Sequence, residues 1–359
     1  MSALASESGM PAVNETLLES FERARDAASR HAATIVFAFS LSGIPTRLRV
    51  TGAALAERLV RPFRHLETGP AALAGPVLAI DAWSETETGI APPRDIPEGH
   101  PPHSIDGRLA YRNQPGGRAV ADRRQGRIIA CFDAAERLSY SDVAKPFRSL
   151  LIPLLYDRGR QLLHGGLIAA SPDAPALLLA GRSGSGKSTV ALAALAAGFR
   201  FLGDDHTCLE LAEKVAIGHS LYATCGIEPG HLGRFERLPG DAVATPDGAK
   251  SVVYLAPQAL HRLDRAARIA AIVIPEIRPG GVTETRPTSR GDALRALMPG
   301  SISILVAAPE TRESPQFNGI GALVERLPAY RLALGPDLAA IAPALRRLSA
   351  ALAAEGAGR

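Results

Sequence analysis

The sequence predicts an α/β fold in which a small, mostly β N-terminal domain precedes a domain built around a glycine-rich loop. Three observations predict this fold. Short apolar strands alternate with helical segments beyond residue 160, a glycine-rich loop joins one such strand to a helix, and strand-like segments dominate the first 140 residues. At about 150 residues per domain, 359 residues suit two domains, which we place at residues 1–142 and 143–359.

The N-terminal domain is expected to hold one helix and several strands. Leu17, Phe21, Ala24 and Ala28 recur at helical spacing and form an apolar face that would dock on the rest of the domain. Alternating or continuous apolar segments predict strands at residues 35–39, 46–50, 77–83 and 127–133. The Pro- and Gly-rich stretch 90–117 is expected to be a loop, and we find no catalytic signature in this domain.

The second domain is expected to be an α/β unit. After a helical, apolar segment at residues 143–155, the pattern predicts strands at 162–164 and 176–180, a glycine loop, a helix at 188–197 and a strand at 199–204. Further strands are expected at 252–255 and 269–274, and a helix at about 338–354 is expected to close the chain.

Composition excludes several classes of protein. With 46% hydrophobic and 21% charged residues, the chain is not predicted to be disordered. The net charge of +4 comes without a basic stripe, so no nucleic-acid partner is indicated. Cys131, Cys208 and Cys225 are isolated, which argues against a disulfide framework or a cysteine zinc site. No signal peptide or membrane span is apparent, so we expect a cytoplasmic protein without a membrane partner.

A phosphate-binding loop is the strongest motif. Residues 181–188 match GxxxxGK[ST], an apolar strand leads into them, and an alanine-rich helix follows. Glycines let successive N–H groups point at phosphate oxygens, the lysine neutralises β/γ charge, and the serine hydroxyl is a ligand for Mg²⁺. The nucleotide-binding residues are therefore expected to be Gly181, Ser183, Gly184, Ser185, Gly186, Lys187, Ser188 and Thr189.

Two further motifs flank the loop. Asp204 and Asp205 stand 17 and 18 residues after Lys187, a distance that allows one helix, a turn and a neighbouring strand. Their side chains would point in different directions from the strand end, so that one can hold metal while the other faces a substrate hydroxyl. His164, followed by two glycines, could orient Asp204 or assist proton transfer, although a single histidine is as compatible with a structural role.

Together these motifs resemble the C-terminal kinase domain of the HPr kinase/phosphorylase family. The resemblance rests on His-Gly-x-Leu at His164, on GxSGxGKS at the loop, and on the aspartate pair, and it covers roughly residues 164–211. The sequence is most similar to the HPr-kinase-like proteins of peptide biosynthesis clusters, such as lasso-peptide kinases. In this family the phosphate loop is related to that of phosphoenolpyruvate carboxykinase, and the acceptor is a seryl hydroxyl on a protein.

The resemblance implies a set of roles. Lys187 and Ser188 would bind ATP and Mg²⁺, Asp204 would be the general base, Asp205 would support the metal, and His164 would position Asp204. The implied activity is an ATP- and Mg²⁺-dependent serine kinase acting on a peptide or protein, including a ribosomal precursor peptide. The N-terminal domain would select or hold that acceptor. Whether the chain forms a homo-oligomer stays an open question.

The sequence departs from the family pattern at two places. The family's Glu-Ile-Arg-Gly signature aligns with residues 221–226, where no carboxylate is present, and Glu228 is the nearby candidate for a second metal ligand. No phosphorolysis loop is recognisable, so reaction with inorganic phosphate is not expected. Lys250 fits either a contact with substrate or nucleotide or an ordinary solvated loop residue. Two other functions stay open: a kinase of a small hydroxyl metabolite and a non-catalytic nucleotide-sensing module.

Overall fold

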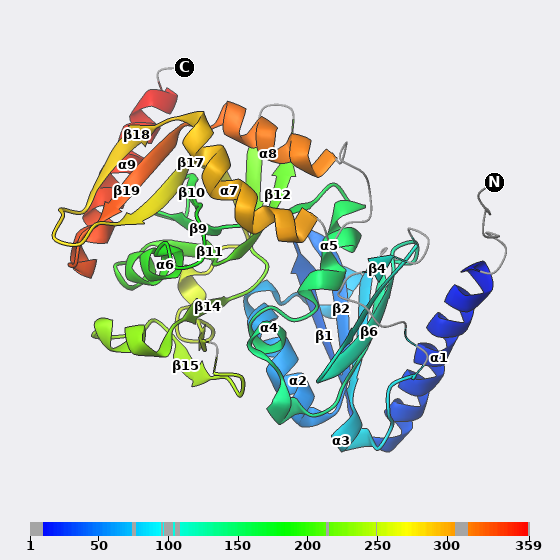
Figure 1. Cartoon of the computed structure of the whole chain (residues 1–359). Coiled ribbons are helices and arrows are strands. Elements are labelled where there is room, and N and C mark those ends of the chain that lie inside the picture. The colour runs from blue at the N-terminus through cyan, green and yellow to red at the C-terminus, as the bar shows by residue number, and fades with distance from the viewer. Residues whose placement is uncertain are drawn as a thin grey trace, which may run out of the picture.

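The computed structural model is a mixed α/β protein with three sheets (Figure 1). It describes residues 10–73, 77–94, 96, 103–104, 108–212, 215–248, 250–305 and 315–357. Among these residues, no helix is both long and apolar enough to cross a membrane.

A seven-stranded sheet forms the N-terminal half, in the order β1-β2-β3-β7-β6-β5-β4. Its strands are β1 (Thr34–Leu41), β2 (Ile44–Thr51), β3 (Leu78–Ser84), β4 (His103–Ser104), β5 (Leu109–Gln114), β6 (Gly117–Asp122) and β7 (Arg127–Phe132). The helices around it are α1 (Met10–His31), α2 (Ala53–Val60), α3 (Glu85–Thr88), α4 (Tyr140–Ala144) and α5 (Arg148–Tyr156), with 3₁₀ turns at Arg61–Leu66, Pro70–Leu73 and Ala135–Arg137. The four strands expected from the sequence are all confirmed.

The expected loop at residues 90–117 is wrong in its second half. β5 begins at Leu109 and pairs with β6 through a tight turn at Pro115 and Gly116. Because Arg112, Asn113 and Gln114 are polar, the outer half of this strand lacks the apolar alternation by which strands are recognised. Residues 95, 97–102 and 105–107 of the stretch lie outside the described residues.

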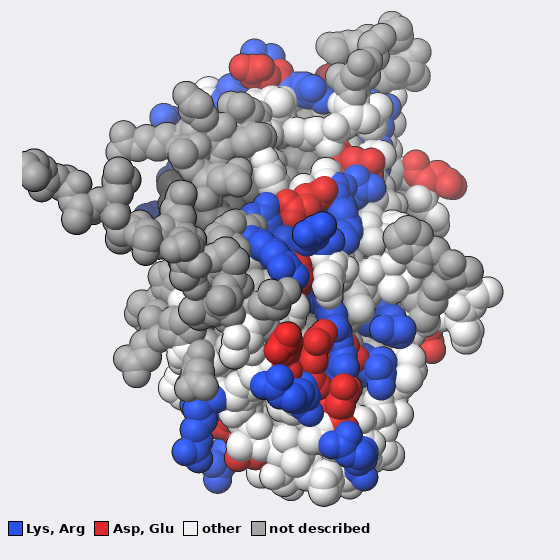
Figure 2. Space-filling view, turned by 90° about the vertical axis from the view of Figure 1, so that its right-hand side faces the viewer, with Lys and Arg blue, Asp and Glu red and all other residues white. Residues whose placement is uncertain are grey.

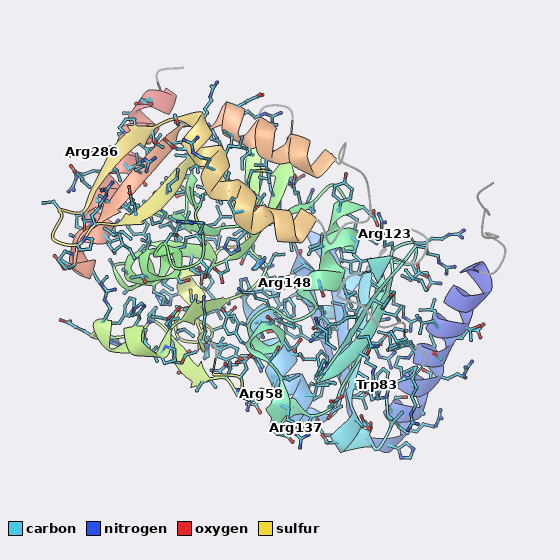
Figure 3. The ribbon with its side chains drawn as sticks, in the orientation of Figure 1. Arg58, Trp83, Arg123, Arg137, Arg148 and Arg286 are labelled. Carbon is cyan, nitrogen blue, oxygen red and sulfur yellow. The ribbon has the colours of Figure 1, made fainter. Side chains whose placement is uncertain are left out.

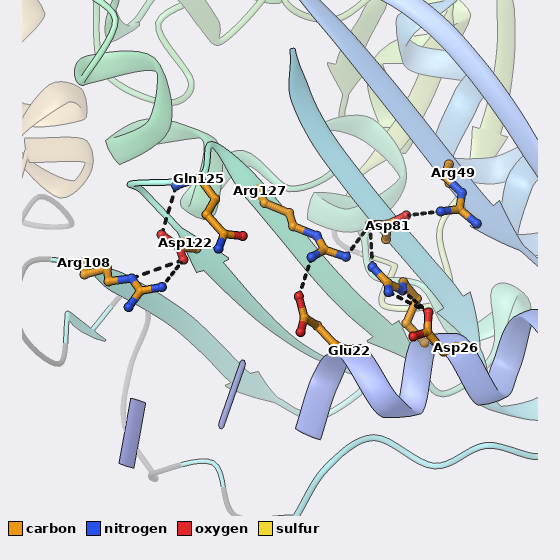
Figure 4. Close-up of polar contacts among 9 residues, drawn as sticks. Glu22, Asp26, Arg49, Asp81, Arg108, Asp122, Gln125 and Arg127 are labelled. Atoms are coloured by element: carbon orange, nitrogen blue, oxygen red, sulfur yellow. Dashed lines mark hydrogen bonds and ion pairs between the residues drawn. The ribbon is translucent and has the colours of Figure 1, made fainter. Parts of the chain in front are cut away.

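Helix α1 is fixed to the N-terminal sheet by its apolar face and by ion pairs. Leu17 and Phe21 are buried against Trp83, whose ring lies 6.3 Å from that of Phe21. Figure 4 shows the polar part of this contact. The buried carboxylate of Asp81 forms ion pairs with Arg25 of the helix at 3.4 Å and with Arg127 of β7 at 3.2 Å. The helical face predicted from spacing is therefore a docking face.

Basic and acidic side chains are interleaved on the face that carries α1. Figure 2 shows blue and red groups side by side there, with white groups around them. This arrangement matches the ion pairs of Figure 4. The described residues of this face therefore form no wholly basic surface.

A nine-stranded sheet forms the C-terminal half. Its main path is β11-β9-β10-β17-β13-β12-β8, and β19 joins β17 while β18 joins β19. The strands are β8 (Gln161–His164), β9 (Gly166–Ala169), β10 (Ala176–Leu179), β11 (Arg200–Gly203), β12 (His206–Leu211), β13 (Ala216–His219), β17 (Ala266–Ile277), β18 (Glu284–Thr288) and β19 (Ala329–Leu334). A separate three-stranded sheet has the order β14-β16-β15, with β14 (Thr224–Ile227), β15 (Asp241–Ala244) and β16 (Ser251–Tyr254).

Helices cover both faces of the nine-stranded sheet. The buried, alanine-rich α6 (Lys187–Ala196) and α9 (Ile341–Ala357) pack on one face, and α7 (Arg290–Leu305) and α8 (Pro315–Arg326) pack on the other. In Figure 1, α7 and α8 run across the top of this half and α6 lies below them. The 3₁₀ turns are Pro229–Arg234, Leu260–Arg262 and Leu338–Ala340.

The two halves share one hydrophobic core. Phe63 of the N-terminal half packs on Tyr222, with ring centroids 5.4 Å apart, and Arg61 stacks 3.9 Å above the ring of Tyr254. The N–H of Ala223 donates to the carbonyl of Pro62 at 2.8 Å. The division that we place after residue 142 falls inside α4, which lies along this shared core.

Candidate active site

The glycine-rich loop connects the end of β10 to the start of α6. Gly186 has φ +99, and a Cβ at this position would lie 2.7 Å from Cδ1 of Leu334, so both backbone and packing require glycine. The buried ammonium of Lys187 donates to the carbonyls of Gly181 at 2.7 Å and Arg182 at 3.0 Å. The strand and the helix that the sequence predicts on either side of the loop are both present.

The remaining loop residues sit at the helix N-terminus. Ser183 and Gly184 are exposed at the tip of the loop, and Ser188 and Thr189 lie in the first turn of α6. The hydroxyl of Ser185 is buried without a hydrogen-bond partner. A helix N-terminus with free N–H groups is a place where proteins bind phosphate.

The aspartate pair follows β11 directly and lies against the start of α6. The hydroxyl of Ser188 donates to Oδ1 of Asp204 at 3.0 Å, and the N–H of Gly226 donates to Oδ2 at 3.2 Å. Asp205 has φ +60, a left-handed conformation that aspartate tolerates better than most residues. Both side chains are buried.

Two glycines let the aspartates approach the loop. We expected β11 to be the direct neighbour of β10, but β9 lies between them and is antiparallel to both. A Cβ on Gly165 would meet the carbonyl of Leu179 at 2.9 Å, and one on Gly166 would meet the carbonyl of Gly203 at 3.2 Å. The His-Gly-Gly motif therefore permits the close strand packing at this end of the sheet.

A lysine that the sequence analysis did not select contacts the second aspartate. Nζ of Lys145, at the end of α4, lies 2.6 Å from Oδ2 of Asp205, and both side chains are largely buried. The hydroxyl of Tyr140, also on α4, is buried without a partner close to Gly226. The one signal that could have identified Lys145 is the rarity of lysine, since only four of the 40 Lys and Arg residues are lysines.

The two carboxyl groups titrate differently. Burial, together with the charge of Asp205, raises the pKa of Asp204 to about 6. Burial opposes ionisation of Asp205 too, but the ammonium of Lys145 holds the pKa of this carboxyl far below its usual range. Burial also lowers the pKa of Lys187, and the nearby aspartates oppose that change. Two neighbouring carboxyl groups of unlike pKa are a common arrangement in catalytic sites.

His164 lies close to Asp205, the chain neighbour of the aspartate that it is expected to position. It ends β8 opposite His206 of β12, with ring centroids 5.5 Å apart, and its backbone N–H donates to the hydroxyl of Ser301 of α7. Burial and the charge of Lys187 lower its pKa to about 4, and the charge of Asp205 acts in the opposite direction. Among the described residues, no hydrogen bond joins His164 to Asp204.

Arg148 brings a further charge to this region. It starts α5, and its guanidinium lies 3.0 Å from Nε2 of the buried His206. Figure 3 shows Arg148 between the two halves of the molecule. The site is therefore lined by the linking segment of α4 and α5 as well as by the sheet.

The oxygen groups present fit a magnesium ion. Ser188 and Asp204 bring a hydroxyl and a carboxylate together, and Asp205 is adjacent. Mg²⁺ prefers such oxygen ligands and commonly takes one or two carboxylates together with substrate phosphates. No cluster of three or more His, Cys, Asp or Glu able to hold a metal occurs in the described part of the chain. Glu228 is exposed after β14, and its carboxylate forms no hydrogen bond or ion pair with another described residue.

Comparison with known proteins adds little to this geometry. No family model matches the sequence, and no curated protein matches it. Among solved structures, the chain is similar to the Hpr(Ser) kinase/phosphatase from Coxiella burnetii, with 12% identity and a TM-score of 0.28 over 52% of this chain and 97% of that one. A likeness of this size identifies neither the family nor the function of the chain.

Proposed function

We propose that the chain is an ATP- and Mg²⁺-dependent kinase that transfers the γ-phosphoryl group to a serine hydroxyl of a peptide or protein in the cytoplasm. One observation carries the proposal: the hydroxyl of Ser188, in the first turn of the helix after the glycine loop, is hydrogen-bonded to Asp204. A phosphate-binding helix start and a buried carboxylate thus meet at one point, as phosphoryl transfer to a hydroxyl requires.

Each residue has a stated part in this mechanism. The loop N–H groups and Lys187 would hold the phosphates, and Asp204 would accept the proton of the attacking hydroxyl. Lys145 would keep Asp205 ionised and in place. Ser188 and Asp205 would hold Mg²⁺, which neutralises charge on the phosphates when bound. His164 lies close to Asp205 and His206, and it would position Asp204 through these two residues.

The test follows ATP and the acceptor together. The purified chain is incubated with ATP, Mg²⁺ and serine-containing peptides, or with small hydroxyl metabolites, and intact mass identifies any acceptor that gains a phosphate. The Asp204→Asn variant is the matched control, because it keeps the shape of the side chain. A phosphopeptide formed only by the unaltered chain supports the proposal.

Other outcomes separate the remaining functions. Phosphorylation of metabolites alone would assign the site to a small-molecule kinase. Tight ATP binding without turnover on any acceptor would indicate a nucleotide sensor. If the chain does not bind ATP, the peptide kinase, the small-molecule kinase and the nucleotide sensor are all contradicted, since the loop would then not be a phosphate site.

A further inference from the structure

Lysine is rare in this chain, and its described members gather at one place. Lys145 contacts Asp205, Lys187 lies over the glycine loop, and Lys250 leads into β16. The fourth lysine, Lys214, lies outside the described residues. The charges of Lys145 and Lys250 are both close enough to Lys187 to add to the lowering of its pKa by burial. Three lysines far apart in sequence therefore surround one pair of carboxylates.

Lys250 differs from the other two because its charge is not paired. Its ammonium has neither a hydrogen bond nor an ion pair with any described residue, although the side chain is half-buried. Its Cδ lies 3.4 Å from the point that a Cβ on Gly226 would occupy. The N–H of Gly226 donates the hydrogen bond to Oδ2 of Asp204. The side chain of Lys250 thus passes beside the backbone that supports the proposed base.

The charge balance of the site favours an anion there. Lys145 is matched by Asp205, whereas Lys187 is bonded to carbonyl oxygens alone. With Lys250, three ammonium groups and the guanidinium of Arg148 face two carboxylates, so positive charge is in excess. An ammonium is a compact charge with three donors, which suits the several oxygens of a phosphoryl group. In a chain that otherwise uses arginine, lysine at all three positions is consistent with this chemistry.

We propose that Lys250 is a second phosphate-binding lysine, which contacts the terminal phosphoryl group of the bound nucleotide. The inference rests on the proposed function, because it assumes that the nucleotide lies on the glycine loop. Lys250 is assigned to the terminal phosphate because it lies beside Gly226, whose N–H donates to Asp204, the residue at which the acceptor hydroxyl would attack. The three-stranded sheet, in which β14 carries Gly226 and β16 follows Lys250, then forms one wall of the site.

Calorimetric titration compares a non-hydrolysable ATP analogue with ADP, which lacks the terminal phosphate. A hydrogen bond to a charged group is worth a factor of about 10 to 100 in affinity. Lys250→Gln is therefore expected to weaken binding of the analogue by about tenfold or more and to leave ADP binding unchanged. Lys250→Arg, which keeps the charge, should recover part of the loss. The thermal midpoint should not move, because Lys250 has no partner to lose.

Arg286→Gln is the control for loss of a positive charge. Arg286 is exposed on β18, pairs with Glu284, and lies at the far end of the molecule in Figure 3. It should bind both nucleotides as the unaltered chain does. Unchanged analogue binding in Lys250→Gln, or an equal loss for analogue and ADP, would overturn the inference. Failure of the unaltered chain to bind the analogue would instead overturn the proposed function.

Discussion

Replacing Asp204 with asparagine is expected to stop phosphoryl transfer while the fold is retained. The carboxylate accepts one hydrogen bond from Ser188 at 3.0 Å and one from the N–H of Gly226 at 3.2 Å. An asparagine oxygen can accept from Gly226, and its NH₂ can donate to the Ser188 hydroxyl, which accepts as well as donates. Because both hydrogen bonds survive, the free energy of unfolding should change by no more than about 1 kcal/mol.

The expected loss of activity follows from proton transfer. An amide cannot accept the seryl proton, so the rate should fall roughly 10²–10⁴-fold, the usual contribution of a positioned general base. Nucleotide affinity should change little, because the loop, Lys187 and Ser188 make the main contacts in the proposal.

Asp205→Asn provides the contrast, because this carboxylate is one half of a buried ion pair. The substitution leaves the ammonium of Lys145 without its partner at 2.6 Å. Removing one member of a buried pair costs about 3–5 kcal/mol, so this variant should be clearly destabilised. The two neighbouring aspartates are therefore expected to separate into one residue needed for chemistry and one needed for stability as well.

The assay combines three measurements on both variants. Urea unfolding gives the stability, calorimetry gives nucleotide affinity at several Mg²⁺ concentrations, and single-turnover transfer to the acceptor gives the rate. Full transfer in Asp204→Asn would refute the assignment of the base. If nucleotide affinity fell in parallel with the rate, Asp204 would be a metal ligand, and the base would be Asp205 or His164.

Four further predictions follow from the same structure. Lys187→Ala should abolish binding of the ATP analogue in calorimetry, and unchanged affinity would show that the loop is not the phosphate site. Gly186→Ala should lower the free energy of unfolding by about 1–3 kcal/mol in urea, because of its φ of +99 and the contact with Leu334; an unchanged midpoint would contradict this. Burial, reinforced by the charge of Arg265, lowers the pKa of His65 to about 3, so the unfolded chain binds its proton first as pH falls. Stability should therefore decrease from about pH 6.5 downward by up to about 1.4 kcal/mol per pH unit, and a His65→Gln variant with the same slope would disprove the cause. The phosphorylated product should survive excess inorganic phosphate, and release of pyrophosphate would show that phosphorolysis occurs.

The local parts of the site could be predicted from the sequence. The strand, the glycine loop and the helix at Lys187 are consecutive, so periodicity and the motif are sufficient to predict them. The same holds for the strand that ends before Asp204. These features depend on neighbours in the chain, and local sequence carries that information.

The contacts between distant segments could not be predicted. Lys145 meets Asp205 across 60 residues, and β9 enters between β10 and β11 because paired glycines allow close packing. Neither follows from periodicity, since register and strand order depend on the whole sheet. The sequence likewise does not indicate that β8 pairs with β12, the pairing that places His164 opposite His206.

The shared core of the two halves has a consequence for synthesis of the chain. A nascent chain emerges from the ribosome N-terminal end first. The seven-stranded sheet is therefore complete before Tyr222 and Tyr254, the residues that cover Phe63 and Arg61, have been made. Until they arrive, that apolar surface faces water and is open to aggregation or to a chaperone. The same two tyrosines donate to the carbonyls of Pro146 and Val143, on either side of Lys145, so the covering of this surface also fixes the segment that carries Lys145 to the site.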